Sequence, residues 1–385
     1  YYVNNQYLHA KKEYERLIAL ESWNEEAIFD YAQTFCQFGF CNRSKEIYEE
    51  LLDFKKHTFS EKALQLNKLE YNPFFEAEYR FFREKGRGEL DRITRNRIDL
   101  SAGYPIDCRQ VLSFSGIFWN ERPHFSTNTD VQNSEQLAKS YPAYGFSIDW
   151  KGALASFLSA DAGFFQKYYD DSFSDRTGGY IHFSWNFYDY LFTGIGFDQE
   201  NKIDNYFSLK NAAQYRRFQV NGRIPVKRKM DIEGNVRFDS FNDSNKMQYH
   251  DFSLAFNLFR NPILIKLKAL AEYRDSEKEN IFVFENGNLV NIIHPYWTPR
   301  NYWAYRLSVD WVHDFSKERY CGNQYRFYEF KASAGNDTEK NPTFTLEGIW
   351  HYEFLKRWTL EISGLLHRSS LWDSEEIKAE MRYRF

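Results

Sequence analysis

The feature that most constrains this chain is an alternation of apolar and polar residues that continues to its last residue. In residues 342–354, large apolar side chains such as Phe344, Leu346 and Trp350 occupy every second position. The two stretches that follow repeat this pattern as far as Phe385. A period of two is that of a β-strand whose two faces meet different surroundings. From residue 73 onward, the sequence therefore predicts a chain built almost entirely of strands.

The length and ends of these stretches favour a membrane barrel over a soluble sandwich. The stretches run about 10 to 13 residues, enough to cross a bilayer at a tilt, whereas soluble strands average about five or six. Aromatic residues stand near their ends, for example Tyr144 with Trp150 and Tyr302 with Trp311. Tyr and Trp at strand ends are typical of the aromatic girdles at the two membrane interfaces.

The connections between these stretches alternate between short and long. Short links are expected at residues 150–152, 259–262 and 355–357. Long polar connections are expected at residues 120–141, 169–177 and 275–301. Short turns at one end and long loops at the other are a mark of outer-membrane barrels.

Composition excludes several other classes of protein. Aromatic residues make up 19% of the 385 residues, too many for a disordered chain. No run of about 18 apolar residues, as a membrane helix requires, is present. The formal net charge of −4 gives no indication of nucleic-acid binding. The four cysteines are too few for a disulfide framework and fit no zinc-site spacing, and the sequence leaves open whether any of them pair.

We predict a 16-stranded antiparallel transmembrane β-barrel over residues 73–385, preceded by a helical domain over residues 1–72. The even number places the helical domain and the C-terminus at the same end of the barrel, although fourteen strands are possible if two weak ones fuse or fail. The predicted strands cover residues 74–83, 91–103, 109–119, 142–150, 153–168, 178–188, 190–200, 206–220, 229–240, 248–258, 263–274, 302–313, 325–336, 342–354, 357–369 and 374–385.

The first 72 residues have a helical period and contain an internal repeat. Small, Tyr and Leu positions recur 34 residues apart, which is the tetratricopeptide period. The segment resembles one complete tetratricopeptide repeat preceded by the second helix of another, with a further degenerate helix at about residues 60–72 and an array expected to extend before Tyr1. An ordinary helical hairpin is the alternative. The residues that carry the repeat signature are Ala10, Tyr14, Leu17, Ser44, Tyr48 and Leu51.

If the apolar face of each strand meets lipid, its charged face must line the interior. Arg or Lys facing lipid at the bilayer midplane costs about 2–4 kcal/mol. The predicted lining is polar and mixed in charge, which weakly favours a neutral or zwitterionic cargo. The candidates for pore-lining residues are Asp231, Glu233, Arg237, Asp239, Lys266, Lys268, Arg306, Asp310, Glu329, Lys331, Glu347, Glu361, Lys378, Glu380 and Arg382.

One aromatic segment stands out at the end of the longest connection. It contains Tyr296, Trp297, Tyr302 and Trp303, with Pro295 and Pro299 stiffening the chain. Clustered rings can anchor a strand at the lipid headgroups or stack on sugar faces, and we favour the interfacial anchor.

Enzymatic motifs are absent from the sequence. It contains no GxSxG, HExxH, P-loop, EF-hand or GxGxxG pattern. We therefore predict no catalytic, metal or cofactor-binding residues, no cofactor, and no enzymatic activity.

The combination of a tetratricopeptide segment with a barrel ending in Phe385 resembles bacterial exopolysaccharide exporters. The group of cellulose synthase C proteins and poly-N-acetylglucosamine porins shares this plan, and residues 296–299 look like the motif that introduces a strand in those barrels. Residues 381–385 look like the signal read by the barrel assembly machinery. The resemblance implies a Gram-negative outer-membrane location and passive passage of a polysaccharide. It also implies periplasmic helices that dock periplasmic or inner-membrane export components.

Two other functions share this architecture. Surface lipoprotein assembly modulators join similar repeats to a barrel, usually of fourteen strands, and move a polypeptide cargo. A structural outer-membrane anchor for a surface assembly is the third possibility. Sixteen strands around an open lumen favour polymer export, whereas fourteen strands with a lateral seam favour protein translocation.

Overall fold

The computed structural model describes most of the chain. It describes all residues except 1–6, 38–39, 86–91, 108–109, 125–139, 156, 171–172, 204–207, 210, 227–228, 260–262, 279–281, 286–287, 292–295, 317–325, 339 and 370–371. No helix among the described residues has both the length and the apolar character needed to span a bilayer.

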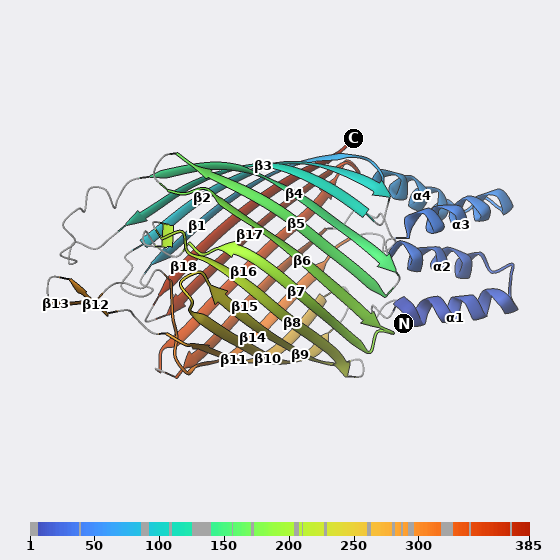
Figure 1. Ribbon diagram of the computed structural model, residues 1–385. Coiled ribbons are helices and arrows are strands. Elements are labelled where there is room, and N and C mark those ends of the chain that lie inside the picture. The colour runs from blue at the N-terminus through green and yellow to red at the C-terminus, as the bar shows by residue number, and fades with distance from the viewer. Residues whose placement is uncertain are drawn as a thin grey trace.

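The chain begins with four helices and continues as strands to its end (Figure 1). The helices are α1 (Tyr7–Leu20), α2 (Glu25–Gln37), α3 (Cys41–Phe54) and α4 (Thr58–Glu70). The strands are β1 (Phe74–Lys85), β2 (Arg92–Asp107), β3 (Gln110–His124), β4 (Tyr141–Ala155), β5 (Leu158–Tyr169), β6 (Arg176–Phe187), β7 (Leu191–Asn201), β8 (Gln214–Val226), β9 (Met230–Phe241), β10 (Lys246–Phe259), β11 (Ile263–Ser276), β12 (Phe282–Glu285), β13 (Asn288–Asn291), β14 (Tyr302–Asp314), β15 (Arg326–Asp337), β16 (Pro342–Phe354), β17 (Trp358–Ser369) and β18 (Asp373–Arg384).

Sixteen of these strands form one closed antiparallel barrel, as the alternation predicted. The two short strands β12 and β13 pair only with each other, within the connection from β11 to β14. The barrel closes between β1 and β18, which pair from Phe74–Arg384 through to Lys85–Asp373. The backbone N–H of Phe385 donates to the carbonyl of Pro73 at 3.0 Å. The helices and the C-terminus therefore meet at the same end, which confirms the parity argument.

Several predicted strand boundaries are wrong by four residues or more. The strands predicted to end at residues 103, 119 and 220 run on to Asp107, His124 and Val226, and two further differences have a clear cause. The expected turn at residues 150–152 lies inside β4, which runs on to Ala155. Lys151 shares a strand face with Asp149, the interior face, where a charge need not end the strand. The eighth strand begins at Gln214 rather than at residue 206, and Leu209 ahead of it packs against the wall instead.

The four helices pack in chain order into a small unit with its own apolar core. The core consists of Phe29, Ala32, Ile47, Tyr48, Leu51, Ala63 and Leu66. Among the residues of the predicted repeat signature, Ala10, Ser44, Tyr48 and Leu51 are buried. Tyr14 donates from its hydroxyl to Asp30 at 3.0 Å, linking α1 to α2. The predicted helices are confirmed, while their assignment to the tetratricopeptide family stays a prediction.

The helical unit stands on two turns that lie across the barrel mouth from each other. The start of α1 contacts the β6–β7 turn, where His9 hydrogen-bonds Tyr190 at 3.0 Å. Near the other edge, Gln65 on α4 accepts a hydrogen bond from Lys356 in the β16–β17 turn at 3.4 Å. Six strands separate these turns on either side of the ring: β8 to β11 with β14 and β15, and β5 to β1 with β18. The helices thus form a layer along a diameter of this mouth (Figure 1).

Asp189 joins α1 to the barrel. Its carboxylate, 1% exposed, accepts from the backbone N–H of Leu8 at 3.0 Å and of His9 at 3.4 Å. It also accepts from the amide of Asn186 at 2.7 Å. The barrel therefore supplies a cap for the first turn of a helix about 180 residues away in sequence, where a carboxylate also interacts favourably with the helix dipole.

We expect Asp189→Gly to loosen α1 from the barrel by about 2 kcal/mol, because buried N–H groups lose their acceptor. Glycine is chosen because residue 189 has a φ of 62°, which glycine adopts without strain. Hydrogen–deuterium exchange of the α1 amides in the purified protein is expected to speed up accordingly.

Lys356→Gly is the matched control. Lys356 has the same φ of 62° in the opposite turn but makes only a long, exposed hydrogen bond to the helices. We expect it to change the opening free energy of the α1 amides, measured by exchange, by less than about 0.5 kcal/mol. Unchanged exchange of α1 in the Asp189→Gly variant would show that other contacts hold the helix.

Candidate functional site: the barrel interior

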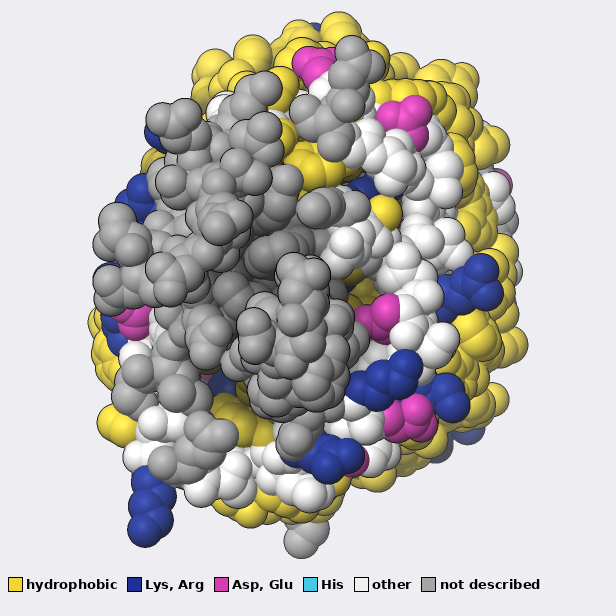
Figure 2. All heavy atoms as spheres, turned by 60° about the vertical axis from the view of Figure 1, so that its left-hand side comes forward, with side chains coloured by type: hydrophobic (Ala, Val, Ile, Leu, Met, Phe, Trp, Pro, Cys, Tyr) yellow, Lys and Arg dark blue, Asp and Glu magenta, His cyan; other side chains and the backbone are white. Residues whose placement is uncertain are grey.

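The two faces of the barrel wall differ sharply in chemistry. Apolar side chains on the outer face remain exposed, including Phe118 at 63% and Leu307 at 70%. Figure 2 looks obliquely at the end opposite the helices and shows hydrophobic side chains covering the outer wall, with charged side chains gathered toward the rim. An apolar outer belt around a closed barrel is the surface of a protein that spans a lipid bilayer.

The structure brings most of the predicted pore-lining residues of β9 and β11 into ion pairs across strands. Each pair joins residues on the same, interior face of the wall. The pairs are Glu233 with Lys268 at 2.7 Å, Asp231 with Arg223 at 3.1 Å and Asp239 with Arg217 at 2.7 Å. Arg237 lies over the ring of Tyr249, 4.2 Å from its centroid, and Lys266 stands opposite Asp310 in the register.

The predicted residues on β14 to β18 also contact polar partners on the interior face, some across strands and some within one strand. Glu329 lies on the same face of β15 as Lys331. The contacts are Arg306 with Glu272 at 3.0 Å, Asp310 with Ser308 at 3.3 Å, Lys331 with Glu347 at 2.7 Å, Glu361 with His351 at 3.1 Å, Lys378 with Glu380 at 2.8 Å, and Arg382 with Glu76. Cross-strand pairing of opposite charges neutralises much of the interior locally.

Sequence reasoning missed the interior residues of β1 to β6. Arg97 forms a bidentate pair with Asp99 at 2.8 and 2.6 Å. His182 bridges Asp161 at 3.0 Å and Asp198 at 2.7 Å. The same alternation marks them, because Arg95, Arg97 and Asp99 occupy every second position of β2, whereas the predicted pore-lining residues begin at Asp231.

A buried ion pair lies on this wall near the end opposite the helices. Lys167 on β5 bonds to Glu121 on β3, and their side chains are 3% and 1% exposed. Glu121 also accepts from the hydroxyl of Tyr169 at 3.0 Å. The ammonium lies 4.6 Å from the ring of Trp119 and 4.7 Å from that of Tyr169. This pair links β3 to β5 across β4, and the rings of Trp119 and Tyr169 shield it.

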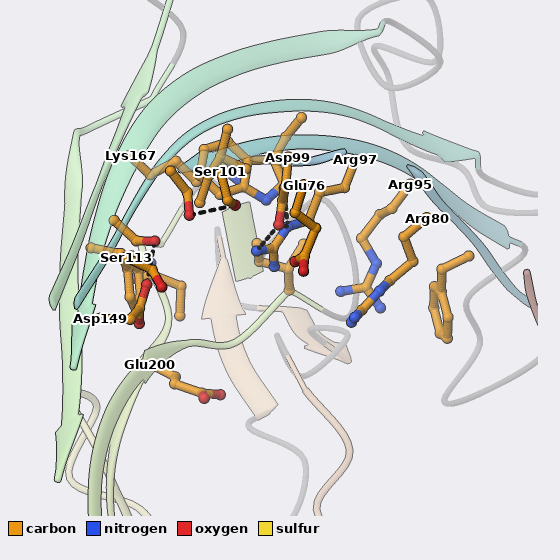
Figure 3. Close-up of a pocket in the computed structure, with 18 of the residues that line it drawn as sticks. Glu76, Arg80, Arg95, Arg97, Asp99, Ser101, Ser113, Asp149, Lys167 and Glu200 are labelled. Carbon is orange, nitrogen blue, oxygen red and sulfur yellow. Dashed lines mark hydrogen bonds and ion pairs between the residues drawn. The ribbon is translucent and has the colours of Figure 1, made fainter. Parts of the chain in front are cut away.

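The same wall contains a cavity of about 750 Å³ that opens into the barrel. Its charged and hydroxyl-bearing lining comes from β1 to β7 and from β18 (Figure 3). Ser101 and Ser115 hydrogen-bond each other at 2.8 Å, and Asp149 accepts from Ser147 at 2.7 Å and from Tyr180 at 2.9 Å. A cavity of this size and polarity suits a small polar ligand or a segment of a polar polymer.

Two connections fold inward at the end opposite the helices. Leu209, in the β7–β8 connection, is fully buried against Tyr141, Ala143 and Tyr169 of the interior face. Arg176 donates to the carbonyls of Ser208, at 3.3 Å, and of Leu209. This contact holds Ser208 and Leu209 away from β8, and it narrows the barrel interior at this end.

Tyr296 makes the second inward contact. It is 2% exposed and stacks on Phe241, with ring centroids 3.9 Å apart and planes 8° from parallel. Its hydroxyl donates to the carboxylate of Asp243, with oxygen distances of 2.9 and 2.7 Å. Burial, followed by this hydrogen bond, raises the pKa of Tyr296 above its usual range, so the phenol remains a donor.

The four rings of the aromatic segment thus divide between the two sides of the wall. Tyr302 and Trp297 meet edge to face at 5.1 Å, and Trp297 lies 4.9 Å from the guanidinium of Arg274 on the interior side. Trp303 faces outward, 40% exposed, and packs on Tyr273. The expectation of an interfacial anchor is wrong for Tyr296, because its ring is buried against Phe241 on the interior side. Of the four, Trp303 alone has an exposed outward position.

Comparisons with known proteins support the fold. A solved structure described as a bacterial polysaccharide outer membrane secretin matches with a TM-score of 0.58 at 10% identity, covering 80% of this chain and 98% of that chain. OccAB3 of Acinetobacter baumannii matches with a TM-score of 0.40 at 10% identity, covering 82% and 98%. OpdK of Pseudomonas aeruginosa with vanillate matches at 0.38 and 10% identity, again covering 82% and 98%. The last two scores are too low to support an argument.

No protein-family model matches the sequence. No curated protein matches it either. The fold is therefore that of an outer-membrane barrel with four N-terminal helices, while membership of the cellulose synthase C and poly-N-acetylglucosamine porin group stays a prediction.

Proposed function

We propose that the protein is a non-enzymatic outer-membrane pore through which an exopolysaccharide passes passively. The observation that carries the proposal is the interior wall, which presents ion pairs and hydroxyl groups inside a closed barrel whose outer face is apolar. A hydrated wall with many donors and acceptors suits a chain of sugar hydroxyls. The likeness in fold to a polysaccharide secretin supports the same interpretation.

The arrangement of the ends supports an orientation in the membrane. The helices lie at the end with short turns, such as residues 188–190 and 355–357, and the longest connections lie at the other end. Outer-membrane barrels have short periplasmic turns and longer extracellular loops. The proposal places the helices in the periplasm, where they dock periplasmic or inner-membrane export components.

Closure of the barrel disfavours the translocon alternative. A lateral exit for a protein cargo needs a weak seam between the first and last strands. Here β1 and β18 are paired along their whole length, and ion pairs of Glu76 with Arg382 and of Glu78 with Lys378 reinforce the joint. These contacts favour passage along the barrel axis.

A clean deletion of the gene is the test. We expect the deletion strain to lose its surface polysaccharide and to accumulate that polymer in the periplasm, and the wild-type gene to restore export. Immunoblots and sugar analysis of washed cells and periplasmic extracts measure both. Unchanged surface polysaccharide, together with loss of a surface protein, would contradict the proposal and support the translocon.

A further inference from the structure

Two arginines enter the cavity of the β1–β6 wall side by side. Arg80 lies on β1 and Arg95 on β2, and Figure 3 shows their guanidinium groups close together in the cavity. The guanidinium of Arg95 lies over the ring of Phe82, 4.2 Å from its centroid. Stacking on an aromatic face holds the planar group in one orientation while leaving its edge donors available.

The other cations of this cavity are already neutralised. Arg97 is paired with Asp99, Lys167 with Glu121 and Arg382 with Glu76. Within the described part of the chain, Arg95 has no carboxylate within 4.0 Å. Its guanidinium is a charge without an opposite partner in a partly desolvated site.

Arg80 is only loosely paired. It contacts Glu78 at 3.1 Å and, through Nε, Glu376 at 3.5 Å. The Nε atom of Arg95 is buried and has no hydrogen-bond partner among the described residues. A buried donor without an acceptor is destabilising, so an incoming acceptor is favoured at Arg95.

The remaining lining determines what kind of anion fits. Ser101, Ser113 and Asp149 line the other side of the cavity, with Ser101 six residues along β2 from Arg95, and suit the hydroxyls of neighbouring sugars in a bound polymer (Figure 3). The lining carries six carboxylates and five cations, so a doubly charged phosphate is disfavoured. A carboxylate brings one charge and matches the planar fork of a guanidinium. The carboxylates are Glu76, Asp99, Glu121, Asp149, Glu200 and Glu376, and the cations are Arg80, Arg95, Arg97, Lys167 and Arg382.

We propose that this cavity binds an acidic polysaccharide segment, with the carboxylate of one acidic sugar held by Arg95 and Arg80 and the hydroxyls of neighbouring sugars meeting the serine-lined side. This proposal rests on the proposed export function. It names the cargo class as a polysaccharide that contains uronic acid. Binding at the cavity is a property of the purified barrel and is measured apart from export.

Calorimetric titration of the full chain in detergent tests the site. We expect tetragalacturonate to bind about tenfold more tightly than the uncharged maltotetraose, and Arg95→Gln to remove that preference. Arg80→Gln is expected to weaken tetragalacturonate binding only severalfold, because the charge of Arg80 is shared with its ion-pair partner Glu78. A gel in SDS without heating, in which a folded barrel migrates differently from the unfolded chain, checks that each variant is folded.

Arg223→Gln is the matched control. Arg223 is an interior arginine on β8, outside the cavity, with a side chain 47% exposed. Its loss removes the same charge and is expected to change binding by less than about twofold. Equal binding of maltotetraose, an equal loss in Arg223→Gln, or full displacement of tetragalacturonate by equimolar sulfate would each overturn the proposal. Binding as expected in a protein whose deletion leaves surface polysaccharide unchanged would retain the site and reject the export function.

Discussion

Replacing Lys167 with methionine is expected to destabilise the barrel by about 3–5 kcal/mol, because it leaves the carboxylate of Glu121 buried without a cation. The carboxylate is 1% exposed and, among the residues that the structure describes, retains the hydroxyl of Tyr169 as its hydrogen-bond partner. Trp119, which packs on the lysine, loses a cation–π contact as well. Urea unfolding of the protein in lipid vesicles, followed by tryptophan fluorescence, measures the loss.

Lys331→Met is the comparison that isolates burial. Lys331 pairs with Glu347 at 2.7 Å, but both side chains are about one-third exposed, so we expect a cost below about 1 kcal/mol. The double variant Lys167→Met with Glu121→Gln is expected to recover much of the lost stability, because it also removes the unpaired buried carboxylate. Equal costs for Lys167→Met and Lys331→Met would mean that water reaches the Glu121 site.

Removing the ring of Tyr296 is expected to widen the barrel mouth opposite the helices. Tyr296→Ala loses the stack on Phe241 and the hydrogen bond to Asp243, at a local cost of about 3 kcal/mol. The inward contact between this connection and the wall then fails. We expect a higher single-channel conductance in planar bilayers, together with faster exchange of the amide of Tyr296's neighbour Trp297.

Two variants sharpen this experiment. Tyr296→Phe keeps the stacked ring and is expected to leave conductance close to that of the wild type, at a cost of about 1 kcal/mol. Trp303→Ala removes a ring of similar size from the outer face of the same segment and is expected to leave conductance unchanged. A conductance increase in Trp303→Ala as large as that in Tyr296→Ala would show that the whole segment, rather than the inward ring, sets the opening.

The strand number, the parity of the chain ends and the positions of the helices could be predicted because they depend on local periodicity. Apolar residues at every second position, as in Phe344 and Leu346, require a sheet with one apolar face wherever the partner strands lie. The short β16–β17 turn was also predictable, since residues 355–357 interrupt two strongly alternating stretches. The turn expected at Trp150 failed because a charge on the interior face looks locally like the end of a strand.

The interior contacts could not be predicted in the same way. Glu121 and Lys167 are 46 residues apart and meet only because β4 sets the register between their strands. Leu209 and Tyr296 lie in connections whose sequences look polar or interfacial, and their inward course depends on space left by the wall.

The sequence by itself determined that this chain forms a closed barrel with a charged interior and helices at one mouth, because a period of two needs no knowledge of distant partners. Only the tertiary structure decided which interior charges are neutralised and which are not. That depends on the register across the ring, which gives Lys167 the carboxylate of Glu121 and places Arg95 beside Phe82. The candidate binding site exists because of this difference.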